Sequence, residues 1–287
     1  MIAHSEEQPS RPKPQSFTVK VLRKNGPGQP SYWAYFTIPY EPELNVISVL
    51  QKIAARGEED GGKKCSPVCW DCNCLEEVCG ACTMVINGRV RQSCSALVDR
   101  LLDEDGATIE LRPMTKFPVV RDLMVDRSRM FQALKKVKAW VPVDGYYDLG
   151  PGPKQSMAAQ EASYPLSECM TCGCCVESCP QFSKIELEQQ SSESAEAFAE
   201  RKEAEYDENF IGPHAISQVV LFNMNPTGEM NKRERMDAVT EEGGIQVCGN
   251  AQNCVSVCPK HIPLTRSIAK VGRDATFHTL KKWFDWS

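Results

Sequence analysis

The sequence predicts an α+β protein with two domains, a strand-rich first half followed by a helical second half. The length of 287 residues suits about two domains. Alternating apolar residues, which are typical of β-strands, occur early in the chain. The fifteen cysteines fall into three tight groups, one in the first half and two in the second. We expect a flexible tail at residues 1–16, a first domain at 17–125 and a second domain at 126–287.

Composition excludes several classes of protein. The formal net charge of -5 argues against a nucleic-acid-binding protein, which usually carries a basic surface. No run of about 18 apolar residues occurs, so we expect no membrane-spanning segment. The tail at 1–16 is polar and acidic and lacks the apolar core of a secretory signal. These features indicate a cytoplasmic chain.

The cysteine content favours metal binding over disulfides. A disulfide scaffold is typical of short secreted domains, whereas this chain is long and has no export signal. Neighbours such as Cys172, Cys174 and Cys175 are spaced for metal coordination rather than for bridging distant loops.

The first domain has the element order of a β-grasp ferredoxin. Apolar residues alternate over 17–23, a turn-rich break covers 25–30, and 32–38 reads as a returning strand. A helix follows, because apolar residues recur at helical spacing and Gly57 provides a stop: Val46, Val49, Leu50 and Ile53. A short strand at 108–111 closes the domain.

The first cysteine group has the spacing of a plant-type [2Fe–2S] ferredoxin. Cys74, Cys79 and Cys82 form C-x4-C-x2-C, and Cys94 follows after a hairpin whose turn is Asn87-Gly88. The alternative is a zinc site of four cysteines, but zinc ligands usually come in C-x2-4-C pairs. We therefore favour a [2Fe–2S] cluster bound by these four cysteines.

Three further cysteines, Cys65, Cys69 and Cys72, lie just upstream of this loop. Starting the motif at Cys72 would break its spacing, so Cys74 is the better first ligand. Their own spacing, C-x3-C-x2-C, leaves open a second metal site. Free thiols are the favoured interpretation, because no fourth local ligand is evident.

The second and third cysteine groups have the spacing of bacterial-type ferredoxins, C-x2-C-x2-C-x3-C-P. The second group matches in full with Cys169, Cys172, Cys175, Cys179 and Pro180. The third group matches at three cysteines and the proline, with Ala251 in place of its second cysteine: Cys248, Cys254, Cys258 and Pro259.

In two-cluster ferredoxins the fourth cysteine of each group binds the other cluster. The expected [4Fe–4S] ligands are therefore Cys169, Cys172, Cys175 and Cys258. Only three cysteines are left for the other cluster, which predicts a [3Fe–4S] site bound by Cys179, Cys248 and Cys254. Cys174 falls outside the register and is interpreted as a bystander thiol.

The rest of the second half suggests surfaces rather than a substrate site. The acidic segment 183–208 reads as a solvated helical excursion, with a docking surface for a basic partner as the alternative. The aromatic and basic C-terminus suits a membrane interface or packing onto the protein. No histidine pair suggests haem binding, and no glycine-rich loop suggests a nucleotide cofactor. We expect no catalytic residue in this chain.

From about residue 17 onward, the chain resembles the iron–sulfur subunits of succinate dehydrogenase and fumarate reductase (complex II). The order of the three cysteine groups carries the resemblance, together with the segments 73–82 (NCLEEVCGAC), 118–123 (PVVRDL), 125–129 (VDRSR) and 253–260 (NCVSVCPK). The segments 140–145 (WVPVDG) and 223–232 (NMNPTGEMNK) resemble the menaquinone-linked bacterial branch.

The resemblance implies two partners and a path for electrons. One partner is a flavoprotein subunit with FAD, and the other is a membrane anchor with haem b and a quinone, menaquinone in this branch. Electrons would pass from flavin through the [2Fe–2S], [4Fe–4S] and [3Fe–4S] clusters to quinone, at the cytoplasmic face of the bacterial membrane. Ubiquinone-linked members have a histidine where this chain has Gly249, so no quinone ligand is carried over.

The resemblance thus favours a subunit of a succinate:quinone oxidoreductase, and three other functions are the alternatives. A quinol:fumarate reductase would use the same clusters in the opposite direction. A soluble thiol-linked fumarate reductase would use them without quinone. A structural zinc protein would perform no redox work.

Overall fold

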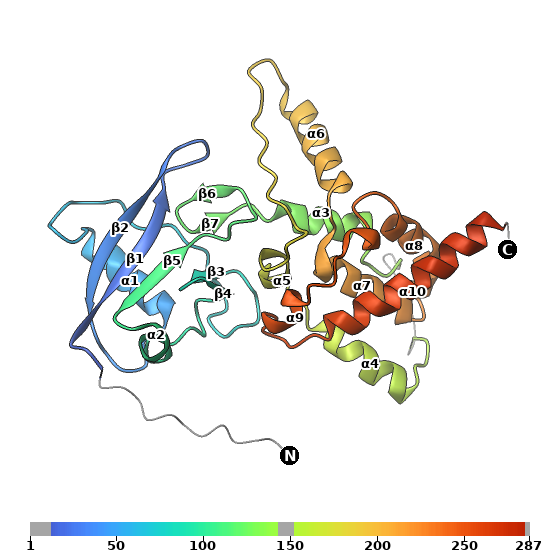
Figure 1. The fold of residues 1–287 in the computed structure, drawn as a ribbon, viewed down its shortest axis with the longest axis horizontal. Helices are drawn as coiled ribbons and strands as arrows, with labels where there is room; N and C mark the ends of the chain where they lie inside the picture. The colour runs from blue at the N-terminus through green and yellow to red at the C-terminus, as the bar shows by residue number, and fades with distance from the viewer. Residues whose placement is uncertain (1–12, 143–151, 285–287) are drawn as a thin grey trace. The chain divides into compact units, whose positions relative to one another are not determined.

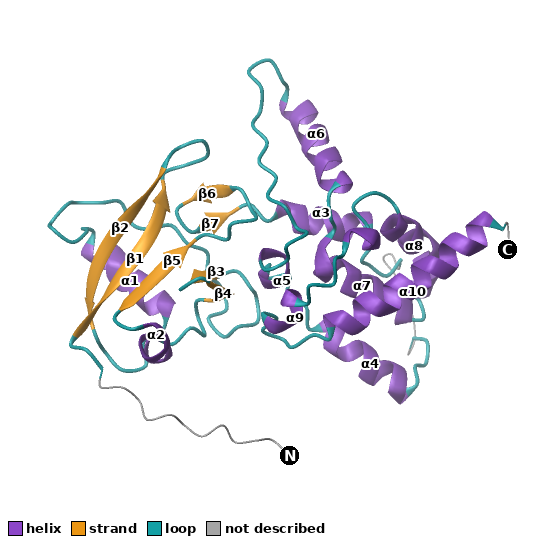
Figure 2. Cartoon of the chain, in the orientation of Figure 1, coloured by secondary structure: helices purple, strands orange, loops and turns teal. Residues whose placement is uncertain are grey.

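The structure, a computed structural model, describes residues 13–142 and 152–284. Figure 1 shows two compact units, and Figure 2 shows that strands belong to one and most helices to the other. The first unit comprises the described residues up to Met114 together with Val119–Val125. The second comprises Thr115–Pro118 and the described residues from Asp126 onward. This confirms the expected order of strands followed by helices.

A five-stranded mixed sheet with the order β2-β1-β5-β3-β4 forms the first unit. The central pair β1 and β5 is parallel, and the other neighbouring strands are antiparallel. The strands are β1 (Ser16–Lys24), β2 (Ser31–Pro39), β3 (Thr83–Ile86), β4 (Arg89–Gln92) and β5 (Thr108–Arg112). The helices of this unit are α1 (Val46–Arg56) and α2 (Val98–Asp105).

The predicted strands and first helix are present, and alternate burial and helix caps stabilise them. Phe17, Val19 and Val21 are buried on one face of β1. The side chain of Asn45 caps α1 by accepting the Ser48 N–H at 2.9 Å. Gly57 ends the helix with φ 68°, a left-handed conformation that favours glycine.

Two elements of the first unit carry no clear signal in the sequence. Helix α2 is only eight residues long and has no side-chain hydrogen bond at its N-cap. The other element is the small hairpin of β6 (Val119–Arg121) and β7 (Met124–Val125). Its turn contains Asp122 with φ 46°.

The second unit is a group of helices around the buried helix α7 (Gly212–Met224), which packs against α10, α4, α3, α5 and α8. The other α-helices are α3 (Ser128–Lys136), α4 (Met157–Ser167), α5 (Cys174–Glu177), α6 (Ala195–Glu208), α8 (Lys232–Thr240), α9 (Asn253–Ser256) and α10 (Leu264–Trp283). Two 3-10 turns are η1 (Gly228–Asn231) and η2 (Ile245–Val247).

Parts of the second unit differ from the sequence-based expectation. The acidic segment 183–208 is helical only in its second half, from Ala195. Arg127 is the N-cap residue of α3, and the Asp126 carboxylate accepts the Ser128 N–H at 2.8 Å.

Several expectations fall outside the described residues. Most of the expected tail at 1–16 does so, but Lys13 is described and binds the Asp99 carbonyl oxygen at 2.7 Å and the Asp103 carboxylate at 2.6 Å. The end of the segment 140–145 and the last residues, 285–287, also lie outside the described residues.

Candidate cluster-binding sites

The loop that carries Cys74 and Cys79 wraps its backbone around their sulfur atoms. Leu75, Glu77 and Gly80 adopt left-handed conformations, with φ of 64°, 56° and 69°. The chain therefore turns repeatedly, and successive N–H groups face inward, as in backbone nests that bind anions.

These N–H groups donate to the thiols. The Glu76 and Val78 N–H groups donate to Cys74 Sγ at 3.5 and 3.4 Å, and the Ala81 N–H donates to Cys79 Sγ at 3.4 Å. The backbone hydrogen bonds lower the pKa of Cys74 to about 7. This loop is prepared to hold thiolates, the form in which cysteine binds iron.

Cys82 and Cys94 lie at the open end of the β3–β4 hairpin. Cys82 precedes β3 and Cys94 follows β4, and both belong to a small buried cluster with Ile47. The turn residues Asn87 and Gly88 have φ of 48° and 76°, as a two-residue hairpin turn requires. Burial raises the pKa of Cys82 to about 12, and the nearby Cys94 thiol contributes to the increase.

The three upstream cysteines have different surroundings. Cys65 packs against the main core, Cys69 joins a backbone hydrogen-bond network, and Cys72 is exposed. Across residues 13–142 and 152–284, no three His, Cys, Asp or Glu side chains are arranged to hold a single metal ion.

In the second unit, cysteines from distant parts of the chain line one cavity of about 20 Å³. Cys169, Cys172 and Cys175 lie there with Cys258, which comes from the third cysteine group. Burial raises the pKa of the Cys175 thiol well above its ordinary value, and its interactions with the other three thiols add to this. The structure thus brings together the four cysteines predicted for the [4Fe–4S] cluster.

A second cavity of similar size contains the other three cysteines of this region. Its lining includes Cys179, Cys248 and Cys254, together with Ala251. Burial raises the pKa of Cys254, and the thiols of Cys179 and Cys248 raise it further. Ala251 therefore lies beside the three thiols, at the position where the motif would have a fourth.

Two short helices place these cysteines. Helix α5 begins after Gly173, which has φ 95°, and α9 begins after Gln252, which has φ 62°. The two helices pack together, and the Asn253 side-chain amide donates to the Ser178 carbonyl oxygen at 3.1 Å. Each helix ends just before the cysteine and proline that close its group, and each of these cysteines lines the cavity that contains cysteines of the other group.

Sequence reasoning did not identify several residues near these cysteines. Cys174, interpreted as a bystander, is buried and lines the first cavity. His214 lines the same cavity, and burial lowers its pKa to about 4. Trp70 packs against the buried group that contains Cys82 and Cys94. A single histidine or tryptophan has no spacing rule that would reveal such a position in the sequence.

Comparison with known proteins agrees with this geometry. Residues 18–132 match the family described as "2Fe-2S iron-sulfur cluster binding domain", and residues 165–262 match the "4Fe-4S dicluster domain". The succinate dehydrogenase iron–sulfur subunit of Bacillus subtilis (strain 168) is 50% identical over 264 residues, which cover 92% of this chain and 94% of the relative. The chain belongs to the succinate dehydrogenase iron–sulfur subunit family.

More distant proteins also match over about nine-tenths of the chain. The fumarate reductase iron–sulfur subunit of Wolinella succinogenes is 26% identical over 262 residues, which cover 89% of this chain and 95% of the relative. A chain of the "Mycobacterium smegmatis Sdh1 complex in the apo form" has a TM-score of 0.69 at 21% identity. It covers 91% of this chain and 95% of its own, and its similarity concerns the fold.

The family confirms the main sequence-based predictions for this chain. The fold class is an N-terminal [2Fe–2S] ferredoxin domain followed by a helical dicluster domain. The chain is the iron–sulfur, electron-transferring part of an oxidoreductase. None of the described helices is both long and apolar enough to cross a membrane.

Proposed function

We propose that this chain binds three iron–sulfur clusters through eleven of its cysteines. The first loop, with Cys74, Cys79, Cys82 and Cys94, holds [2Fe–2S]. The two cavities of the second unit hold [4Fe–4S] and [3Fe–4S]. When bound, the clusters supply one-electron carriers between a flavin and a quinone. The two cavities carry this proposal, because each combines cysteines from both distant groups.

The donor sets suit these clusters chemically. Thiolates are soft ligands that select iron–sulfur clusters over hard cations. In the first loop the backbone N–H groups of Glu76, Val78 and Ala81 already point at sulfur. Hydrogen bonds of this kind stabilise the negative charge of a bound thiolate.

The [3Fe–4S] assignment depends on Ala251. Cys179, Cys248 and Cys254 supply three thiolates, and the methyl group of Ala251 supplies none. Three cysteines can hold three irons. We infer that this site has the higher potential of the two in the second unit, since it lacks one negative ligand.

We infer that the domain boundary for function lies near residue 125, with a cluster domain on either side. The flavoprotein subunit with FAD is proposed as the electron donor. A membrane anchor with haem b and a quinone, menaquinone in this branch, is proposed as the acceptor at the cytoplasmic face of the membrane. The 50% identity to a Bacillus subtilis succinate dehydrogenase subunit, against 26% to a fumarate reductase subunit, favours succinate oxidation.

Exchange of ligands between the two cysteine groups gives a direct test in the purified complex. We expect Cys258→Ser to remove or weaken the [4Fe–4S] cluster and spare the [3Fe–4S] signal. Cys179→Ser should do the reverse, although it lies in the same sequence group as most [4Fe–4S] ligands. Electron paramagnetic resonance (EPR) with iron and sulfide analysis measures both outcomes.

The matched control is Cys72→Ser, which removes an exposed thiol outside all three ligand sets. It should leave the three signals at wild-type intensity. Loss of [4Fe–4S] in Cys179→Ser, with [3Fe–4S] retained, would contradict the exchange. A colourless complex containing zinc would contradict redox function altogether.

A further inference from the structure

Trp70 lies just upstream of the first cysteine loop and packs against a buried group of residues that contains two of its cysteines. Its indole ring contacts the buried cluster of Ile47, Cys82 and Cys94, and it also packs against the main core of the unit. The side chain is partly buried as a whole, but its Nε1–H is shielded from solvent. No acceptor among the described residues lies within hydrogen-bond distance of this N–H.

A buried donor without an acceptor is uncommon, because it loses its hydrogen bond to water and gains none in return. The indole packs against the buried group of residues that contains Cys82 and Cys94, two of the proposed cluster ligands. Thiolates and the sulfides of a cluster carry negative charge and accept hydrogen bonds from surrounding N–H groups. The orphaned donor therefore fits an acceptor that arrives with the cluster.

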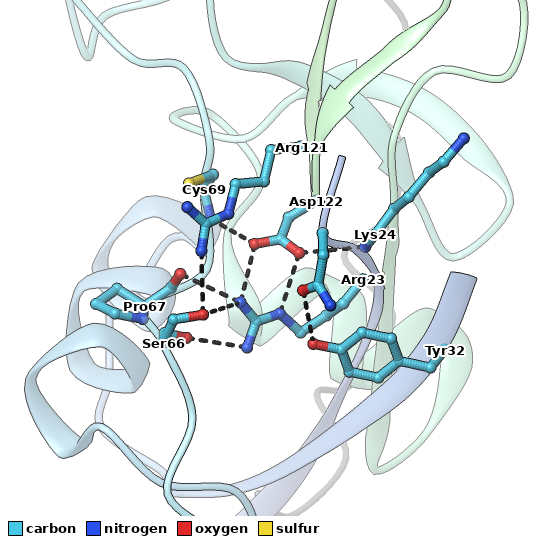
Figure 3. Close-up of polar contacts among 9 residues, drawn as sticks. Arg23, Lys24, Tyr32, Ser66, Pro67, Cys69, Arg121 and Asp122 are labelled. Atoms are coloured by element: carbon cyan, nitrogen blue, oxygen red, sulfur yellow. Dashed lines mark hydrogen bonds and ion pairs between the residues drawn. The ribbon is translucent and has the colours of Figure 1, made fainter. Parts of the chain in front are cut away.

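The segment just before the tryptophan is firmly held, as Figure 3 shows. The Arg23 guanidinium donates to the carbonyl oxygens of Ser66 and Pro67 at 2.9 and 3.2 Å. The Cys69 N–H donates to Asp122 Oδ2 at 3.0 Å. Both sides of this segment are thus hydrogen-bonded, which fixes the backbone that leads into Trp70.

We propose that Trp70 Nε1–H donates a hydrogen bond to a sulfur atom of the [2Fe–2S] site. This inference rests on the proposed ligand set of the first loop. Arg23 and Asp122 act as positioning residues, because they hold the backbone that carries the indole. The hydrogen bond stabilises the reduced, more negative state and so raises the reduction potential of this site.

Trp70→Phe in the intact complex removes the N–H and keeps an aromatic ring in the same packing. We expect the [2Fe–2S] cluster to stay bound. The ratio of reduced to oxidised cluster at a fixed potential should fall about 2- to 10-fold, as expected for one hydrogen bond. The potentials of the other two clusters should not change. A redox titration followed by EPR measures all three.

Trp33→Phe is the matched control, because Trp33 lies on β2 against the cations of Lys20 and Arg112, 3.8 and 4.9 Å from its ring centre. It should leave the [2Fe–2S] potential unchanged. A Trp70→Phe complex with full cluster content and wild-type potential overturns the proposal.

A second measurement needs no variant and covers the case in which Trp70→Phe fails to fold. In wild-type complex labelled with ¹⁵N only in the indole ring, pulsed EPR should detect magnetic coupling between the reduced [2Fe–2S] cluster and an indole nitrogen. A normal cluster signal without this coupling overturns the inference alone. A complex with no [2Fe–2S] signal overturns the ligand set and this inference together.

Discussion

Arg23 and Asp122 form a completely buried ion pair, in which Nη2 lies 2.9 Å from Oδ2 and Nε lies 3.1 Å from Oδ1. Both side chains have no exposed surface. The remaining donors and acceptors are also used: Arg23 binds two carbonyl oxygens, and Asp122 accepts the N–H groups of Lys24 and Cys69. The pair therefore joins β1, the β6–β7 hairpin and the segment before the first cysteine loop.

Asp122→Ala is expected to destabilise the first unit by about 3–5 kcal/mol, because it leaves the Arg23 charge buried without a partner. The [2Fe–2S] content of the purified complex should fall, since the segment that leads into its loop loses an anchor. Chemical denaturation followed by visible circular dichroism of the [2Fe–2S] cluster measures the change.

Glu41→Ala is the control for this pair. Glu41 binds Lys52 at 2.9 Å, but both side chains are more than one-third exposed, so its loss should cost less than about 1 kcal/mol. If Asp122→Ala is no more destabilising than Glu41→Ala, the buried pair does not hold the loop as described.

The fold could be predicted where short-range patterns decide the structure. Alternation on β1 and the caps of α1 are local, and both elements form as expected. Alternation also continues to Arg23, which occupies the fourth inward position of β1. Its burial could not be foreseen, because the partner that makes it tolerable comes 99 residues later.

The same contrast between local pattern and tertiary packing explains which site residues could be predicted. Cysteine spacing identified both distant groups, and the structure places Cys258 beside Cys175 as the motif implies. Trp70 and His214 reach the same regions only through tertiary packing. One aromatic residue or histidine without a spacing rule gives no signal in a single sequence, so these positions required the structure.

Ala251→Cys should convert the [3Fe–4S] site to a [4Fe–4S] site and lower its potential, because a fourth thiolate can hold the fourth iron. The backbone on both sides is already tightly curved, with φ of 51° at Asn250 and 62° at Gln252. These turns hold residue 251 at the cavity that contains Cys179, Cys248 and Cys254. The oxidised [3Fe–4S] EPR signal should disappear.

Ala251→Ser is the control for this substitution, because it places a hydroxyl oxygen where Ala251→Cys places a sulfur and so adds no thiolate. It should keep the [3Fe–4S] signal. If Ala251→Cys keeps that signal at full intensity, residue 251 does not lie where a fourth ligand would bind.

Gly212 lets the start of α7 approach helix α5. Its φ is 87°, and a Cβ at this position would lie 2.7 Å from a methyl carbon of Val176. Gly212→Ala should destabilise the second unit by about 1–3 kcal/mol through backbone strain and overpacking. The melting temperature of the complex and the retention of its [4Fe–4S] cluster measure the effect.

Gly272→Ala provides the opposite expectation within the same unit. Gly272 lies inside α10, and a Cβ there would meet no atom of the described residues within 4 Å. The substitution should stabilise the helix by about 0.5–1 kcal/mol. Equal destabilisation by both variants would contradict the steric role of Gly212.

Asp126 anchors the acidic helix α6 to the start of α3. Its carboxylate accepts from Lys202 Nζ at 2.7 Å and from the Ser128 N–H at 2.8 Å. Burial raises the pKa of Asp126, but the hydrogen bonds from Lys202 and Ser128 outweigh it, so the pKa lies below its ordinary value. Burial lowers the pKa of Lys202, but the hydrogen bond to Asp126 raises it by more, so the pKa lies above its ordinary value.

The signs of the two shifts define the pH range of this anchor. A carboxylate with a lowered pKa stabilises the fold above its unfolded pKa of about 3.9, and the contribution is lost as pH falls through the folded pKa. A lysine with a raised pKa contributes below its unfolded pKa of about 10.4, and the contribution is lost as pH rises through the folded pKa. The anchor should therefore be constant between about pH 6 and 8, where both groups are fully charged.

Asp126→Asn should release α6 at every pH in this range. Limited proteolysis by a protease that cleaves after acidic residues should cut the segment 183–208 faster, by about 3- to 10-fold, which corresponds to roughly 1 kcal/mol of lost anchoring. The ratio of variant to wild-type rates should not change between pH 6 and 8. Glu200→Gln, on the exposed surface of the same helix, should leave the rate near wild type. A ratio that rises steeply with pH would show that another titrating group, and not the Asp126–Lys202 pair, holds α6 in place.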